Sequence, residues 1–201
     1  DNFSPKVKDV IAFSKEEALR LGHDFIGTEH LMLGLLRKAN GEAYEILSSF
    51  DVNITNLRKK SEALNPTSNI DNINNKKSLH LTKQAEKALK STFLEAKLFK
   101  SESISTAHLL LCILRNENDP TTKILNNFNI YYDDVKEVFQ EMFIDSEKTE
   151  TIQKVDFEKW LDTTTWLKGE DDGVFGGDHE GNPREFPFKW DFTNDDIYSE
   201  D

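Results

Sequence analysis

IGTEHLMLGLLR, residues 26–37, and ISTAHLLLCILR, residues 104–115, are two versions of one stretch that lie 78 positions apart in this 201-residue chain. They align without a gap, and the same shift places Glu17-Ala18 on Glu95-Ala96 and Ile46-Leu47 on Ile124-Leu125. So many identities in a single register indicate an internal duplication. Two copies are too few for a solenoid, so we expect one compact domain with pseudo-twofold symmetry.

Apolar residues recur at helical spacing through the first copy, and neither copy shows sustained strand alternation. Ser4 followed by Pro5 is a typical start for a helix, which we expect to end at Gly22. Three further helices are predicted: one capped by Thr28 and ending near residue 41, one over 42–50 and one over 54–64.

The second copy repeats this plan. Thr82 and Thr106 are the expected caps of its first two helices, and Asp119-Pro120 supplies the cap and first-turn proline of its third. The sequence therefore predicts an all-α fold of eight helices in two four-helix units. We place the repeats at about 3–64 and 81–143, with an Asn-rich linker over 65–78.

The formal charge of −12 is concentrated beyond residue 144. Residues 145–201 hold 17 acidic residues against 6 Lys and Arg, whereas residues 1–144 are close to neutral. This shift predicts a domain over 1–144 followed by an acidic, aromatic tail over 145–201. The excess of acid argues against nucleic acid as a partner. No apolar run is long enough to span a membrane, and no signal-peptide pattern occurs, so we expect a cytoplasmic protein.

Catalytic and cofactor motifs do not occur in the sequence, so we expect no enzyme activity, no cofactor and no metal. It has no Gly-x-x-x-x-Gly-Lys-Ser/Thr loop, no nucleophile elbow and no His-Glu-x-x-His motif. His30 and His108, each in the first turn of a predicted helix, are interpreted as packed, hydrogen-bonded core residues. Cys112 lies among leucines and is interpreted as a small buried residue.

The run from Glu16 to Arg37 closely resembles the N-terminal domain of Clp unfoldases, especially ClpC, and the duplicated motif fits the same family over residues 1 to about 144. The resemblance implies an eight-helix double repeat that docks adaptor proteins and delivers unfolded or tagged substrates to a hexameric ATP-driven unfoldase, with ClpP as the partner peptidase. Because the chain has no Walker motif, it lacks the motor itself. It is either part of a longer ClpC-like protein or a stand-alone regulator.

Some ClpC relatives recognise phosphorylated arginine through the Gly-Thr-Glu-His segment, and Gly27, Thr28 and Glu29 match it here. A helix N-terminus offers N–H groups to a phosphate, and a carboxylate can hold the guanidinium. In the second copy Thr106 is kept, but Ala107 replaces the glutamate. The resemblance thus implies one competent copy and one defective copy. The alternative is that Glu29 is only a first-turn glutamate favoured by the helix dipole.

The tail carries every tryptophan of the chain. Its large aromatic side chains are costly to leave in water, which favours a docking or self-packing segment over a plain linker. The expected partner-binding residues are Trp160, Trp166, Phe186, Phe188 and Trp190. A stand-alone regulator would use this tail to bind a second partner.

Overall fold

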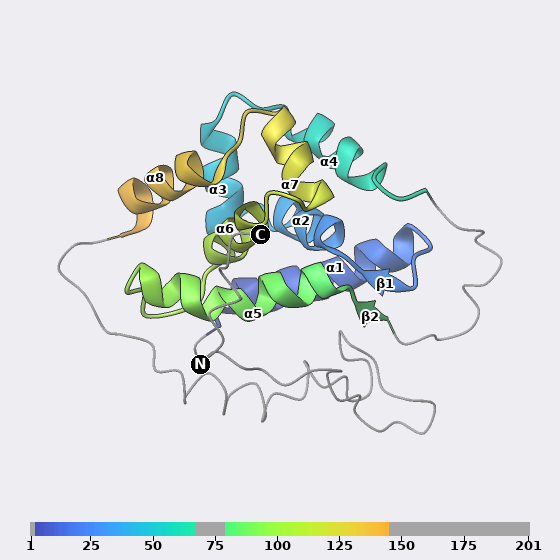
Figure 1. Cartoon of the computed structure of the whole chain (residues 1–201), viewed down its shortest axis with the longest axis horizontal. Coiled ribbons are helices and arrows are strands. Elements are labelled where there is room, and N and C mark those ends of the chain that lie inside the picture. The colour runs from blue at the N-terminus through green and yellow to red at the C-terminus, as the bar shows by residue number, and fades with distance from the viewer. Residues whose placement is uncertain (1–2, 67–78, 145–201) are drawn as a thin grey trace, which may run out of the picture.

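The structure is a computed structural model that describes residues 3–66 and 79–144. Within these ranges it contains eight α-helices, which confirms the predicted pair of four-helix units (Figure 1). The first unit holds α1 (Pro5–Arg20), α2 (Thr28–Arg37), α3 (Glu42–Ser49) and α4 (Ile54–Glu62). The second unit holds α5 (Lys83–Leu98), α6 (Thr106–Arg115), α7 (Pro120–Asn127) and α8 (Tyr132–Phe143).

The predicted starts of α1, α5 and α7 are confirmed, whereas α2 ends at Arg37, four residues before the predicted end near residue 41. The side chains of Ser4, Thr82 and Asp119 accept hydrogen bonds from the first turns of α1, α5 and α7. Gly22 follows α1 with a φ of 73°, a conformation that glycine adopts without strain.

The prediction that Thr28 and Thr106 are N-caps is wrong. The caps of α2 and α6 are Gly27 and Ser105, and each threonine is the first helical residue. The physical reason lies two residues further on. Gly27 N–H donates to His30 Nδ1 at 2.9 Å, and Ser105 N–H donates to His108 Nδ1 at 2.8 Å. These imidazoles fix the turn one residue earlier and leave the threonine hydroxyls for other partners.

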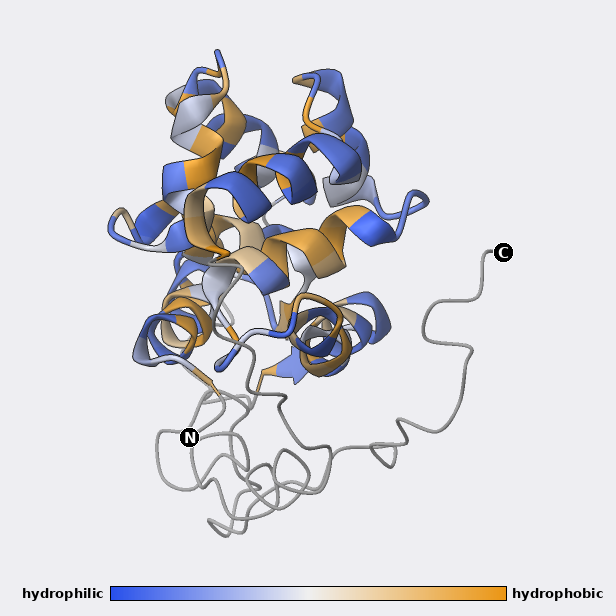
Figure 2. Cartoon of the chain, turned by 90° about the vertical axis from the view of Figure 1, so that its left-hand side faces the viewer, coloured by the Kyte–Doolittle hydropathy of each residue, from blue (hydrophilic) through white to orange (hydrophobic). Residues whose placement is uncertain are grey.

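Helices α2 and α6 form the centre of the molecule, and each is buried from its first residue to its ninth. Longer α1 packs on α2, and α5 packs on α6, so each repeat contributes a matching helix pair to one continuous core. Figure 2 shows the most continuous hydrophobic colour on helices in the middle of the molecule, with hydrophilic segments around them.

Two short parallel backbone pairings connect the repeats, which the sequence did not predict. Strand β1 (Phe25–Ile26) pairs with β2 (His80–Leu81), and Phe3 forms a bridge with Ile104. Under the shift of 78 these are the same pairing made in both directions. Strands of two residues are too short to show alternating apolar and polar residues, so the sequence pattern could not predict them.

Candidate functional site

The hydroxyls of Thr28 and Thr106 each reach the third helix of the other repeat. Thr106 Oγ1 accepts a hydrogen bond from Ala43 N–H at 2.9 Å and donates to Glu42 Oε2 at 3.0 Å. Because Gly41, the cap of α3, has no side chain, Thr106 provides the missing cap from across the interface. Sequence reasoning selected these threonines as binding residues, and here their buried hydroxyls join the two repeats.

The Thr28 hydroxyl makes the matching contact in the other direction. It donates to Asp119 Oδ1 at 2.8 Å and lies 2.8 Å from Thr121 Oγ1. Asp119 already accepts from Thr121 N–H within its own helix, so this carboxylate serves both repeats. Burial raises the pKa of Asp119, and its hydrogen bonds with Thr28 and Thr121 oppose that shift.

The Glu29 carboxylate lies directly over Gly27, at the N-terminus of α2. A Cβ atom at position 27 would be 2.4 Å from Glu29 Oε2, so the glycine leaves the room that this carboxylate fills. Asn65 Nδ2 donates to Glu29 Oε1 at 3.0 Å. The residue is only 5% exposed, and burial raises the pKa of Glu29, against hydrogen bonds from its own N–H and from Asn65. The carboxylate thus takes the position at the helix N-terminus that suits an anion.

Sequence reasoning missed Asn65, because that residue lies in the segment interpreted as a linker. The corresponding corner of the second repeat has Ala107 in place of Glu29, as the sequence shows. The two copies of the motif therefore present different surfaces at their helix N-termini. Only the first places a carboxylate over its cap residue.

Both first-turn histidines are packed core residues, as predicted. His30 Nδ1 accepts from Gly27, so its Nε2 carries the proton and donates to His23 Nδ1 at 2.8 Å. Burial and the neighbouring His23 lower the pKa of His30 to about 3, and burial lowers that of His108 to about 3. His23 stacks on Phe25, with ring centroids 5.0 Å apart. The imidazoles of His30 and His108 are therefore neutral structural groups at neutral pH.

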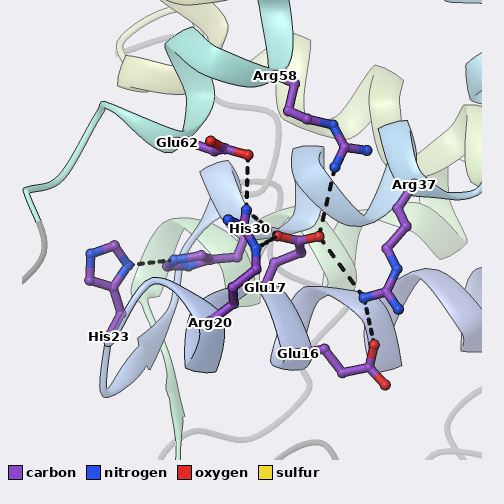
Figure 3. A network of polar contacts seen from close by, with 8 residues as sticks. All are labelled: Glu16, Glu17, Arg20, His23, His30, Arg37, Arg58 and Glu62. Carbon is purple, nitrogen blue, oxygen red and sulfur yellow. Dashed lines mark hydrogen bonds and ion pairs between the residues drawn. The ribbon is translucent and has the colours of Figure 1, made fainter. Parts of the chain in front are cut away.

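A second polar centre surrounds the buried carboxylate of Glu17 (Figure 3). Arg20 from the same helix donates to it at 2.6 Å, and Arg37 from α2 and Arg58 from α4 approach within 3.9 and 4.0 Å. Its counterpart Glu95 bonds Arg115 and the Tyr132 hydroxyl. The sequence contained a sign of this network, because Glu17 and Arg37 of the first copy correspond to Glu95 and Arg115 of the second. This network joins helices within each repeat.

Within the ranges 3–66 and 79–144, the side chains that commonly ligate metals are not clustered, and the single cysteine of the chain is buried. No group of three or more His, Cys, Asp or Glu side chains there is placed to hold a metal ion. Cys112 is 5% exposed, and burial raises the pKa of its thiol well above the usual range, so its thiolate is not available as a nucleophile. No described helix combines the length and apolar character that crossing a membrane requires. The tail residues expected to bind a partner, Trp160, Trp166, Phe186, Phe188 and Trp190, lie outside the described residues.

The family model for the Clp repeat (R) N-terminal domain matches residues 2–128. The chain belongs to this family. This confirms the resemblance drawn from the doubled motif, and the family's fold agrees with the eight helices described here.

Relatives of this Clp N-terminal domain include the chaperone protein ClpB of Oceanobacillus iheyensis, 32% identical over 133 residues. The negative regulator of genetic competence ClpC/MecB of Bacillus subtilis is 31% identical over 128 residues. Each match covers 64% of this chain and 15% of the relative. The chain therefore corresponds to a small part of those relatives.

Solved N-terminal domains of other proteins share the fold at low sequence identity. The Hsp104 N-terminal domain of Candida albicans matches with a TM-score of 0.60 and 12% identity, covering 78% of this chain and 99% of that one. The N-terminal domain of ClpD from Arabidopsis thaliana matches with a TM-score of 0.54 and 16% identity, covering 69% of this chain and 95% of that one.

Proposed function

We propose that this chain is a non-catalytic docking domain of a cytoplasmic ClpC-like unfoldase and protease system, where it receives adaptor proteins and unfolded or tagged substrates. The observation that carries the proposal is the family match over residues 2–128 in a chain without a Walker motif. The unfoldase ring and the ClpP peptidase are then its indirect partners. A double repeat with one continuous core is a rigid platform, as docking requires.

The test is a graft. The 201-residue chain replaces the N-terminal domain of Bacillus subtilis ClpC, and degradation of an unfolded protein is followed with ClpP present. We expect degradation above that of the same unfoldase without any N-terminal domain. A folded graft with normal ATP hydrolysis and no gain in degradation would contradict the proposal.

We further propose that the N-terminus of α2, with Gly27, Thr28 and Glu29, is where an arginine-phosphorylated substrate binds. The support is the helix N-terminus, which attracts an anion, next to a carboxylate suited to a guanidinium. For a phosphoryl group to approach, the Glu29 side chain must first turn away from Gly27 and release Asn65. The phosphoryl group then takes the place of the carboxylate at the helix end, and the turned Glu29 carboxylate pairs with the guanidinium of the same phosphorylated residue. Thr106 marks the corresponding position in the second copy, where the carboxylate is lacking.

An arginine-phosphorylated peptide is titrated against the wild type, Glu29→Ala and Glu45→Ala. Glu45 is the matched control, since it is also a first-turn glutamate but lies exposed on α3. We expect Glu29→Ala alone to lose affinity. Equal affinity in all three proteins would contradict the proposed binding site at α2. It would not affect the proposed docking function of the domain, which the graft experiment tests.

The alternative function is a stand-alone regulator that binds one partner through the double repeat and another through residues 145–201. The observation in its favour is the composition of that segment, which is acidic and rich in aromatic residues. A reading frame that continues past Asp201 into a Walker motif would exclude it.

A further inference from the structure

The outer face of α5 is basic. The exposed charged residues of this helix and of the turn after it are all lysines, namely Lys83, Lys87, Lys97 and Lys100. Leu98 lies among them with 58% of its surface exposed. We call these five residues the basic α5 face. The acidic residues of the helix, Glu86 and Glu95, are buried.

The two buried acids offset this charge only weakly. Glu95 points inward and is taken up by Arg115 and Tyr132. Burial raises the pKa of Glu86 to about 7, against the nearby charges of Lys83 and Lys90, so its carboxyl is partly protonated at neutral pH. The basic α5 face therefore presents mainly positive charge to its surroundings, and the next exposed acid along the chain is Glu102, just beyond Lys100.

The corresponding helix of the first repeat, α1, has no lysines at the matching positions, so the fold does not require them. Under the shift of 78, Lys83, Lys87 and Lys97 correspond to Pro5, Asp9 and Leu19 of α1. The exposed charges of α1 are used within the domain: Asp9 pairs with Lys38, Glu16 with Arg37 and Arg20 with Glu62. In contrast, Lys87, Lys97 and Lys100 form no ion pair with any residue of the described ranges.

Two of the lysines, Lys83 and Lys87, are placed unfavourably for the helix. Lys83 is the first residue of α5, where the positive end of the helix dipole disfavours a cation. Lys83 and Lys87 are four residues apart, so two like charges face each other on one surface. Because Lys87, Lys97 and Lys100 have no ion pair in the described ranges and the Lys83/Lys87 pair is unfavourable for the helix, this face suits an anionic partner outside the domain.

The chain itself contains a segment of opposite charge. Residues 145–201 have a net charge of −11 and include nine aromatic residues. Helix α8, which precedes this segment in the chain, ends at Phe143, and its Phe139 ring lies 5.2 Å from the ring of Phe99, the cap residue at the C-terminal end of α5 (Figure 1). Attachment at this point gives the segment an effective concentration on the order of millimolar at the face.

We propose that the basic α5 face is the docking surface for the acidic, aromatic segment 145–201 of the same chain. The lysines attract its carboxylates, and Leu98, together with the exposed Met142 and Phe143, gives its aromatic rings apolar contact. Because the attraction lies at the surface, salt weakens it, with a screening length of about 8 Å at physiological ionic strength. The inference goes beyond the proposed function, since it concerns a face that the α2 site does not use.

The tryptophans make a specific probe, because Trp160, Trp166 and Trp190 all lie in the segment and residues 1–144 contain none. In the full-length chain we expect their emission to be blue-shifted from that in denaturant and protected from acrylamide. The double variant Lys87→Glu/Lys97→Glu, or high salt on the wild type, should move both signals at least halfway to the denatured values. The matched control is Lys59→Glu/Lys60→Glu on exposed α4, which makes the same charge change and should have no effect.

Zero-length carbodiimide cross-linking of the full-length chain then identifies the occupant. An equimolar mixture of ¹⁴N and ¹⁵N chains is used, and we expect Lys87 and Lys97 to link to Asp or Glu of 145–201 within one isotope. Links of mixed isotope would overturn the proposal in favour of a second copy. Fully exposed tryptophans without such links would overturn it in favour of another anionic partner. Either result leaves the graft experiment unaffected.

Discussion

At the scale of single residues, the cap supplied across the repeat interface makes a direct prediction. Thr106→Ala removes the acceptor for Ala43 N–H and leaves that group buried without its hydrogen bond. We expect the free energy of unfolding to fall by roughly 1–2 kcal/mol, measured by urea denaturation followed by circular dichroism. Thr55→Ala, on the exposed side of α4, is the control and should change stability little. Equal effects of the two substitutions would show that the cross-repeat cap contributes nothing.

A second residue-scale prediction concerns His108 and acid. Burial holds the pKa of His108 at about 3, below its ordinary value of 6.5. Between these values the unfolded chain binds a proton that the folded chain does not, so the stability that this imidazole contributes is present above pH 6.5 and is lost as the pH falls toward 3. His108→Gln removes the titration while keeping a side chain that can accept from Ser105 N–H, as capping boxes do.

We therefore expect the difference in unfolding free energy between wild type and His108→Gln to fall with decreasing pH. Well below pH 6.5 the slope approaches about 1.4 kcal/mol per pH unit, the value for one proton. Urea midpoints measured from pH 7 to pH 4.5 give this difference, and titrating groups common to both proteins cancel in it. Parallel pH profiles would mean that His108 takes up protons equally in both states.

At the scale of helix pairs, Gly34 sets how closely α1 approaches α2. A Cβ atom there would lie 2.5 Å from Val10 O and 2.6 Å from Ser14 Oγ. Gly34→Ala gains up to about 1 kcal/mol in helix propensity, yet we expect a net loss of roughly 1–3 kcal/mol because the backbone of α1 must move. Chemical denaturation measures the loss. Adding Ser14→Ala should recover only part of it, since Val10 O stays in place, and a stabilised Gly34→Ala would contradict the close packing.

The helices themselves were largely predictable, because local features determine them. Ser4-Pro5 and Asp119-Pro120 mark their helix starts through contacts within a few residues, and the structure confirms both. The threonine caps were mispredicted because a histidine ring, two residues after each threonine, accepts the N–H of the preceding residue. Histidine is not among the usual capping side chains, so the sequence pattern did not suggest it. Likewise, Asn65 contacts Glu29 across 36 positions of sequence, and no local pattern contains that information.

At the scale of the whole molecule, the two repeats exchange parts in ways that make neither complete alone. Phe3 of the first repeat pairs with Ile104 of the second, and β2 before the second repeat pairs with β1 of the first. Phe3, Ile26 and Ile104 belong to one core, and Leu81 packs against it. Sequence duplication predicted the symmetry, but the duplicated stretches look the same whether the copies pack as neighbours or exchange strands and caps. Only the structure shows that each repeat supplies strand and cap contacts to the other.

The exchange predicts that the domain unfolds as one cooperative unit. Gly34→Ala lies in the first repeat, but its effect should reach the second, because opening α2 also removes the Thr28 contact at Asp119 and the backbone pairing at Ile26. In native-state hydrogen exchange, the most protected amides of α2 and α6 should lose the same free energy of opening in this variant. Loss confined to α1–α4 would show that the repeats unfold separately, and the caps and strands that join them would then contribute little to stability.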